Sequence, residues 1–524
     1  MADKVQFPFI NAPLIPAEPV RAVKPKVTTF IGQKLAGGSA TALEVIEDID
    51  ANAEDALFGA GSMLAEMIRN YRKTNNVSQV NAIALEDGAG TSSEGIVTFT
   101  GTNATENGTF TVYAGDKDSE HKAIVPVVID DTPTLVGDAL EAAITALTRT
   151  PVTAVNAVGV VTLTAKNKGT VGDGINLIVE GSVAGISVAL TAFTGGATDP
   201  VITNIEDLMD EYRTDVVMPH EYGIGDMVDF LDSRFNFANN ILDGVLFTGI
   251  VDTKSNLVVV GDAENSQSLL IQGDKPVAKT FKTGNALGAQ IQNRVAMIAG
   301  TRALRLNDNS SLASIMTTRT PADNIGGVHT ATLPYANTLV VTLDPIPLGE
   351  GFKGDSQSGE VKDLMDAGFS LMGNNESRNA IILGELLTMY KTNIQGLTDL
   401  TYKFLNYVDT STASREFIFL GLKIDYGQAR LTDGQSLSEH PSASENGVKA
   451  DMMKYYQSLS SEEFVLLRSG VLGSTGSTVA EKYNDALVVN IDLLTGTIDI
   501  QAILPIYTQT RIINAPLAIT FNLN

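Results

Sequence analysis

The chain has 524 residues, with 61 Asp and Glu against 36 Lys and Arg, which gives a net charge of −25, and it contains no cysteine and no tryptophan. A single hydrophobic core stops growing at roughly 250–300 residues, so we expect several domains. The acidic balance argues against nucleic acid and anionic membrane as partners. The absence of cysteine excludes disulfides, thiolate nucleophiles and zinc ribbons. Because the N-terminus lacks the pattern of a secretory signal, we expect a soluble product made in a cytoplasm.

The first 26 residues are predicted to form an extended N-terminal arm. Prolines disfavour a helix or a central strand, and this segment has five of them: Pro8, Pro13, Pro16, Pro19 and Pro25. Apolar side chains, including Phe7, Phe9 and Ile10, are scattered through the same segment. A segment with apolar side chains and no fold of its own usually lies on another surface, sometimes that of another chain.

The next part of the chain has the pattern of an α/β core. Strand candidates at 27–32 and 77–85 flank a predicted helix at 52–73, which is the βαβ arrangement of a parallel sheet. The same pattern returns after residue 199. Further helices are predicted at 203–213, 223–235, 285–304 and 376–392, and further strands at 216–218, 245–250, 257–260, 269–271 and 339–343. We therefore predict a core of residues 27–90 and 199–400.

Residues 91–198 differ in composition and are predicted to form an inserted, mostly β domain. They are dense in Thr, Val, Gly and Asn. A helix is predicted at 134–147, among strands at 96–100, 108–114, 122–129, 152–156, 159–165, 175–181 and 186–194.

The C-terminal part is predicted to be an α+β domain at 401–484, followed by strands and an arm at 485–524. A helix is predicted at 447–459, and strands at 486–494, 497–505 and 512–523. The last 40 residues carry very few charges, and apolar strands of this kind aggregate if their edges stay open. They pair either within their own domain or with another subunit.

The sequence contains several incomplete catalytic and binding motifs. Residues 32–39 follow a strand and resemble a phosphate-binding loop, but Gly38 stands where that loop needs lysine. No local zinc motif is formed by the four histidines, which are His121, His220, His329 and His440. The simplest interpretation is that each lies at the surface or has its ring nitrogens hydrogen-bonded within the protein. His220 follows a predicted strand where α/β active sites often lie, yet no nucleophile motif accompanies it.

Acidic residues crowd the segment 199–243, where the only basic residues are Arg213 and Arg234. The segment lacks the spacing of a calcium-binding loop. Two interpretations remain open: a solvated acidic face, or an acidic patch that meets a basic patch on a repeated neighbour.

Several long strings resemble the contractile tail sheath proteins of Mu-like bacteriophages. They are FIGQKLAGGSATA (30–42), ALFGAGSMLAEMIRNYRKTN (56–75), VNAIALED (80–87), GIVTFTG (95–101), VTLTAKNKGTVGDGINL (161–177), DPIPLGEGF (344–352) and LLTMYKTNIQGLTDLTYKFL (386–405). Their order and spacing extend the resemblance over nearly the full length. One departure is the string AEPVRAVKPKV near the N-terminus, where many relatives have a PGVY-like string.

The resemblance implies a non-enzymatic structural subunit of a virion tail, without cofactor or metal, made in a bacterial host. Family members stack as six-membered rings around a tail tube and contract at a trigger from the baseplate, driving the tube through the host envelope. The expected partners are other copies of the chain, the tube protein, and baseplate and tail terminator proteins. The core would have a subtilisin-like topology without protease activity, and residues 91–198 would face outward.

The resemblance also suggests particular contact residues. The arms would add strands to neighbouring subunits, and the arm residues we single out are Phe7, Phe9, Ile10, Ile512, Ile513, Ile519 and Phe521. The helix at 447–459 would contact the tube through Lys449 and Lys454, which lie about 140° apart on a helix and flank an apolar face. A plain surface helix is the alternative for these lysines. For the whole chain, the alternatives are an α/β hydrolase with His220 as base, or another tail component such as a tube or baseplate protein.

Overall fold

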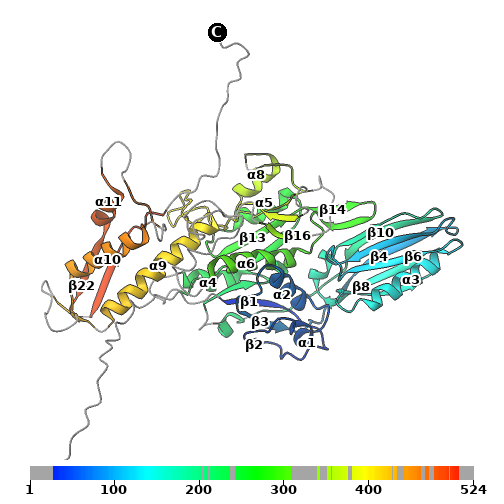
Figure 1. Ribbon diagram of the computed structural model, residues 1–524, viewed down its shortest axis with the longest axis horizontal. Coiled ribbons are helices and arrows are strands. Elements are labelled where there is room, and N and C mark those ends of the chain that lie inside the picture. Colours follow the sequence, from blue (N-terminus) through cyan, green and yellow to red (C-terminus); the bar gives the residue numbers. More distant parts are fainter. Residues whose placement is uncertain are drawn as a thin grey trace, which may run out of the picture.

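The computed structural model describes residues 27–202, 204–209, 213–235, 242–307, 339–342, 351–355, 357–375, 380–427, 429–432, 442–461, 467–470, 477–494 and 496–506. Within these residues the fold is mixed α/β with several sheets, and the molecule is elongated (Figure 1). A β-rich part lies at one end, a mostly parallel sheet in the middle, and a part built on helices and a hairpin at the other end. The predicted arm residues Phe7, Phe9, Ile10, Ile512, Ile513, Ile519 and Phe521 lie outside the described residues, as do His329 and His440.

The central sheet has the strand order β13-β12-β11-β1-β3-β2. Its strands are β1 (Val27–Gln33), β2 (Val45–Ile46), β3 (Val80–Leu85), β11 (Thr214–Val217), β12 (Leu246–Val251) and β13 (Leu269–Asp274). All neighbours are parallel except β2, which is antiparallel to β3. Every residue of β1, β3, β11 and β13 is buried, as expected for a parallel sheet covered on both faces.

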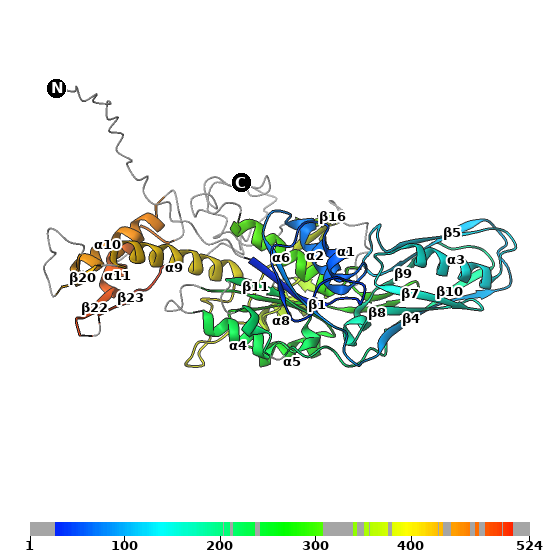
Figure 2. The ribbon, with the colours of Figure 1, turned by 90° about the horizontal axis from the view of Figure 1, so that it is seen from below.

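Helices cover both faces of this sheet, as Figure 2 shows. On one face lie α1 (Glu54–Phe58), α2 (Met63–Thr74) and α6 (Ile291–Asn307), and on the other lie α4 (Gly225–Arg234) and α5 (Lys254–Ala263). The single helix predicted at 52–73 is divided into α1 and α2 because Gly59 and Gly61 between them have φ of 88° and 82°. The helices predicted at 223–235 and 285–304 are confirmed as α4 and α6.

Three predictions for the core are wrong. The strand predicted at 257–260 lies inside α5, which begins after Thr253, whose hydroxyl accepts a hydrogen bond from the Asn256 amide. The helix predicted at 376–392 is contradicted by strand β19 (Ala380–Leu383), which pairs with β16 (Leu339–Thr342) and β18 (Met372–Asn375). In place of the helix predicted at 203–213, the described residues contain a short 3₁₀ helix, Glu206–Met209.

The β-rich end contains every element predicted for 91–198, in the predicted order. These are β4 (Ser92–Gly101), β5 (Gly108–Ala114), β6 (Lys122–Val127), α3 (Pro133–Ala146), β7 (Val152–Ala157), β8 (Val160–Lys168), β9 (Leu177–Glu180) and β10 (Ile186–Thr194). They form two sheets, β10-β4-β8-β7 and β14-β15-β9-β5-β6. The second sheet includes a hairpin from a later part of the chain, β14 (Pro276–Lys279) and β15 (Lys282–Asn285). The β-rich end therefore shares a sheet with the middle of the molecule.

The other end is joined to the middle by α9 (Leu405–Tyr426), at 22 residues the longest helix in the described part and not predicted from the sequence. Beyond it lie α10 (Glu445–Leu459), α11 (Val479–Ala486), and the hairpin of β22 (Val488–Asp492) and β23 (Thr497–Gln501). The predicted helix at 447–459 is thus confirmed as α10. Four further short elements are α8 (Gly359–Asp366), β17 (Gly354–Asp355), and the paired strands β20 (Arg430–Leu431) and β21 (Ser442–Ala443).

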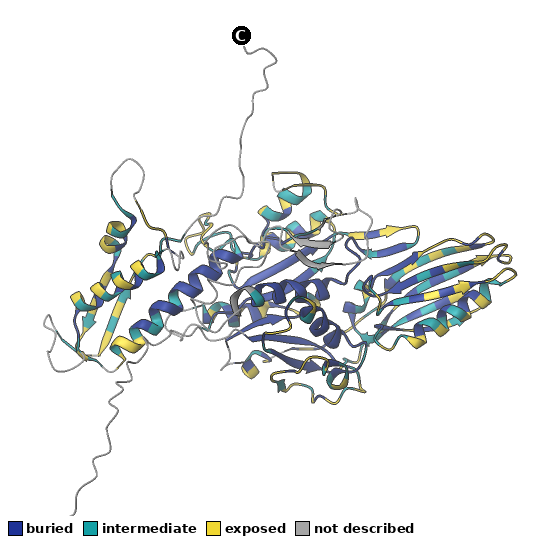
Figure 3. Ribbon diagram, in the orientation of Figure 1, coloured by how far each residue is buried: buried dark blue, intermediate teal, exposed yellow. Residues whose placement is uncertain are grey.

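The N-terminal half of α9 is buried against the central sheet, as the colouring of Figure 3 shows. Arg302 of α6 pairs with Asp215 at 2.5 Å and with Asp409 of α9 at 2.6 Å, and all three side chains are at most 2% exposed. Two further ion pairs, Arg213–Glu416 and Arg415–Asp243, join α9 to the core. Among the helices of the described residues, none has an apolar run long enough to cross a bilayer.

Replacing Arg302 with Met should strongly destabilise the fold, because two buried carboxylates would lose their cation. Removing one partner of a buried ion pair costs about 3–5 kcal/mol. We therefore expect a loss of that size in the free energy of unfolding, measured by urea denaturation with circular dichroism. The control is Lys362→Met, which removes an exposed pair with Asp366 and should cost less than about 1 kcal/mol. Equal effects of the two changes would contradict the structural role of Arg302.

Candidate functional site

The carboxyl ends of β1 and β11 mark the position where an open α/β sheet most often binds a ligand. The chain runs from β1 to β3 on one side and returns to β11 on the other, so the strand order reverses at β1. Here this position is filled by protein. Gln33, the last residue of β1, donates to Asp87 at 2.6 Å and to the Lys168 carbonyl at 2.8 Å, and accepts from the Tyr222 hydroxyl at 2.9 Å.

The N-terminus of α2, next to this position, is also occupied. Such a terminus attracts anions because its amide groups lack partners within the helix. The Asn167 side-chain oxygen accepts from the Met63 amide at 2.9 Å, and Ser62 accepts from the Ala65 amide. After the loop at 32–39 no helix begins before Glu54. The loop that resembles a phosphate site therefore has neither the lysine nor an open helix terminus.

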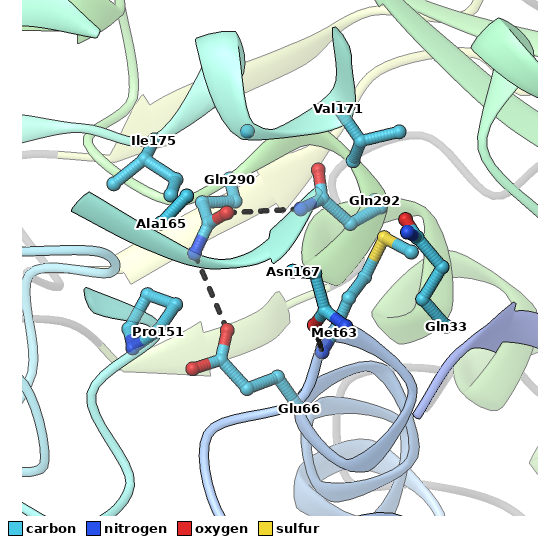
Figure 4. A pocket seen from close by; sticks show the side chains of 11 residues that line it. Gln33, Met63, Glu66, Pro151, Ala165, Asn167, Val171, Ile175, Gln290 and Gln292 are labelled. Carbon is cyan, nitrogen blue, oxygen red and sulfur yellow. Dashed lines mark hydrogen bonds between the residues drawn. The ribbon is translucent and has the colours of Figure 1, made fainter. Parts of the chain in front are cut away.

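A small space of about 20 Å³ lies between α2 and the β-rich end (Figure 4). Glu66, Asn167, Gln290 and Gln292 are among the side chains that line it. In Figure 4, Gln290 joins Gln292 and Glu66 by hydrogen bonds of 2.9 and 3.3 Å. A volume of this size holds about one water molecule, so the space has no room for a substrate.

A cluster of buried charges lies beside this space and joins the β-rich end to α2. His121, on the loop between β5 and β6, is hydrogen-bonded through Nε2 to Glu66 at 2.9 Å and through Nδ1 to Asp118 at 2.7 Å. The side chains of His121 and Glu66 are each 2% exposed. Nearby, Asp116 accepts from the Gln290 amide at 2.6 Å and from Asn293 at 2.9 Å. Polar groups from three elements are thus paired out of contact with water.

The electrostatics of this cluster favour a charged histidine. Burial alone would lower the pKa of His121, but attraction to Glu66 and hydrogen bonds to Asp118 and Glu66 outweigh it and raise the pKa to about 10. Burial raises the pKa of Asp116 to about 6. Burial would also raise the pKa of Asp118, but the hydrogen bond and charge of His121 lower it overall. His121 is therefore an imidazolium that donates to two carboxylates at neutral pH.

A second group of ion pairs extends the same junction toward the surface. Arg149 pairs with Asp55 of α1 and with Glu120, both at 2.7 Å. Arg69 of α2 pairs with Asp55 at 2.5 Å and approaches Glu120 at 3.5 Å. Two of these pairs, Arg149–Asp55 and Arg69–Glu120, cross between the core and the β-rich end. This junction could not be predicted from the sequence, because Arg149 and Asp55, which pair across it, are 94 residues apart along the chain.

Among the described residues, none is placed as a catalytic partner of His220. It begins a 3₁₀ helix after β11, as its position in the sequence suggested. Within the described residues its Nδ1 is buried without a hydrogen-bond partner, and burial lowers its pKa. In the part of the chain that the structure describes, no carboxylate therefore holds Nδ1 and orients the ring, as a general base would need. In the described part of the chain no group of three or more His, Asp or Glu side chains is arranged to hold a metal ion.

The acidic segment 199–243 is divided between interior and surface. Asp215 and Asp243 are buried, and both form the ion pairs with α9 and α6 described above. Asp207, Asp226 and Asp229 are exposed. Both interpretations of the sequence assumed one acidic face. In the structure only some of these acidic residues are at the surface.

Helix α10, which carries the predicted contact residues Lys449 and Lys454, packs through its apolar side against α9 and β22. Met452, Tyr455 and Tyr456 are buried there. Lys449 is half-buried and Lys454 is exposed, so both lie outside the buried side.

Comparisons with known proteins agree with the resemblance found in the sequence. No protein-family model matches the chain. Among curated proteins, the Mu-like prophage FluMu tail sheath protein of Haemophilus influenzae is 33% identical over 178 residues, which is 33% of this chain and 35% of that protein. The match therefore spans about a third of the relative's length. Over that segment the chain is similar to a Mu-like tail sheath protein.

Solved structures of sheath proteins are similar at lower identity. The sheath tail proteins of Desulfitobacterium hafniense and Listeria innocua are each 10% identical, with TM-scores of 0.42 and 0.43. The first match covers 91% of this chain and 92% of that chain, and the second covers 93% and 94%. The contracted helical sheath of the anti-feeding prophage is 9% identical, with a TM-score of 0.43 over 99% of both chains. At these identities and scores, the structural likeness adds nothing to the sequence match.

The charge of His121 makes the stability of the junction depend on pH. A folded-state pKa of about 10 exceeds the ordinary 6.5, so the stabilisation is complete below pH 6.5 and is lost as pH rises toward 10. We expect the free energy of unfolding to fall by about 1.4 kcal/mol per pH unit between pH 7 and 9.5.

In His121→Gln this slope should vanish, whereas His220→Gln should keep it, because the pKa of His220 is lowered and its ring is neutral above pH 7. Urea denaturation at a series of pH values measures the slopes. The same slope in wild type and His121→Gln would contradict the charged state of His121.

Proposed function

We propose that this protein is a structural subunit of a contractile phage tail sheath and not an enzyme. The observation that carries the proposal is the 33% identity over 178 residues to a curated tail sheath protein. The match spans about a third of each chain, so the role of the whole protein is our inference. The protein-filled carboxyl edge of the central sheet gives no support to the alternative of an α/β hydrolase with His220 as base.

In this proposal, copies of the chain stack as six-membered rings around a tail tube and contract to drive the tube through the host envelope. The baseplate and tail terminator proteins would bind the two ends of the sheath, and the assembled protein would be part of the virion tail. Residues 27–90 and 199–400 would form a core of subtilisin-like topology. Residues 91–198 would face outward, and residues 401–484 would face the tube.

The hairpin of β22 and β23 supports a role in strand exchange between subunits. Within the described residues each of these strands pairs only with the other. A two-stranded sheet is marginally stable alone, and its open edges accept further strands. We propose that arm segments of neighbouring copies add to this hairpin, through Phe7, Phe9 and Ile10 of the N-terminal arm or Ile512, Ile513, Ile519 and Phe521 of the C-terminal arm. Main-chain hydrogen bonds of this kind would persist while side-chain interfaces change.

Electron microscopy of the purified protein tests the proposed function. Sheath subunits should polymerise without other components into hollow helical tubes wide enough to surround a tail tube. A tube protein would instead give narrow filaments, and a hydrolase would stay dispersed. Narrow filaments or dispersed particles at all concentrations would contradict the proposal.

The N-terminal arm should control assembly and not folding. Deletion of residues 1–26 should leave the circular dichroism spectrum and thermal unfolding of the full chain nearly unchanged, because a segment with five prolines contributes little to a core. The shortened protein should no longer form helical tubes. Normal polymerisation of this variant would show that the arm is dispensable.

The two lysines of α10 should contribute to tube binding. Changing Lys449 and Lys454 together to Glu should weaken assembly on preformed tubes, and the loss should be larger at low salt because salt screens exposed charges within about 8–10 Å. The matched control changes Lys423 and Lys482, two exposed lysines of the same end of the molecule, to Glu. Co-sedimentation with tubes over a salt series measures the effect. If the two double variants bind tubes equally well, Lys449 and Lys454 do not contribute to tube binding.

A further inference from the structure

An open pocket of about 500 Å³ lies on the middle part of the molecule, and three of the nine described residues that line it are aromatic. Phe235 follows α4, and Tyr390 and Tyr402 lie on the segment between β19 and α9. The ring of Tyr402 meets the other two edge-on, with centroid distances of 5.2 Å to Phe235 and 5.4 Å to Tyr390. All three side chains are half-buried, so part of each ring is accessible from the pocket.

The walls of this pocket are held in place by hydrogen bonds and charge. The side chain of Asn265 accepts from the Lys391 and Thr392 amides and donates to the Thr392 carbonyl, at 2.8 to 3.0 Å. The guanidinium of Arg415 lies 4.3 Å from the centroid of the Phe235 ring and pairs with Asp243. The pocket is therefore formed before any ligand binds, which lowers the entropic cost of binding.

The N-terminal segment of the same chain has the sequence that aromatic pockets of this kind recognise. Residues 13–19 read PLIPAEP, with prolines at positions 13, 16 and 19. A polyproline II helix has three residues per turn, so these three prolines would lie along one edge. Aromatic-lined grooves bind such helices because the extended conformation costs little entropy to fix.

The chain enters the described structure close to this pocket. The amide of Val27, the first residue of β1, donates to the Arg213 carbonyl at 3.4 Å. Arg213 pairs at 2.5 Å with Glu416, which follows the pocket residue Arg415 on α9. Val27 lies eight positions after Pro19, and an extended chain of that length reaches roughly 26–29 Å. Residues 13–19 can therefore reach the pocket of their own chain.

We propose that residues 13–19 dock as a polyproline II segment in the pocket formed by Phe235, Tyr390 and Tyr402 of the same chain. Docking fixes the point from which residues 1–12 leave the subunit, and with it the direction in which Phe7, Phe9 and Ile10 extend. The proposal concerns a contact within one chain, so it holds whether or not the protein is a sheath subunit.

The absence of cysteine from the chain permits a direct test in the full-length protein. Ala17→Cys is combined with Ile394→Cys, since Ile394 lines the pocket and is 96% exposed, so that its replacement should not disturb the fold. Mild oxidation in dilute solution should give a disulfide within one chain, seen as a faster band on a non-reducing gel and as a linked peptide by mass spectrometry. The control combines Ala17→Cys with Val158→Cys, an 83% exposed position after β7 at the far end of the molecule.

Replacing Pro13, Pro16 and Pro19 with Ala in the first variant should slow formation of this disulfide by about tenfold, because the local concentration of the segment at the pocket would fall. Tyr402→Ala should slow it similarly, with the circular dichroism spectrum as the check on folding. A disulfide only between two chains would overturn docking within one chain. A rate no higher than that of the Val158 control, or no effect of the proline replacements, would overturn the docking itself.

Discussion

Buried ion pairs fix how the three parts of this molecule meet. At one junction the imidazolium of His121 lies between Glu66 and Asp118, and at the other Arg302 lies between Asp215 and Asp409. An ionised group out of contact with water is tolerated only with its partner in place. Each junction therefore permits one arrangement of its parts and strongly disfavours a partly separated one. The shared sheet of β9 and β15 adds main-chain hydrogen bonds to the first junction.

This constraint bears on the proposed function. A subunit that transmits force during contraction must not bend between its parts, and paired buried charges resist bending more than an apolar interface that can slide. The accessible features lie elsewhere: the hairpin of β22 and β23, the lysines of α10, and the aromatic pocket beside α9. Changes between subunits during assembly would then involve these surfaces, while the interior of each subunit stays the same.

Much of the fold follows from the sequence, and the failures have physical causes. The elements of 91–198 alternate clearly and are bounded by turns, so their order was predicted correctly. Helix α9 was missed because the charges that pair with the core, Asp409, Arg415 and Glu416, interrupt the apolar pattern of a buried helix. The strand at 257–260 was predicted from three β-branched valines, which favour strands. In the structure these valines lie in α5, whose N-terminus is capped by Thr253.

The candidate sites were less predictable than the fold. His121 had no distinguishing neighbour in the sequence except Asp118, since its other partner, Glu66, is 55 residues away. Lys449 and Lys454 could be placed beside an apolar helix face because helical periodicity alone determines that position. The aromatic pocket brings together residues from four separate segments, which only the tertiary structure reveals.

Native-state hydrogen exchange measures most directly whether the buried charges unite the molecule. If they do, the slowest amides of β1, of β9 in the β-rich end and of α9 should exchange through one common opening, with the same free energy and the same response to urea. In the His121→Gln variant, the amides of β9 should exchange through an opening that leaves β1 protected. Exchange of β9 or α9 in the wild type through a smaller opening that leaves β1 protected would contradict this account.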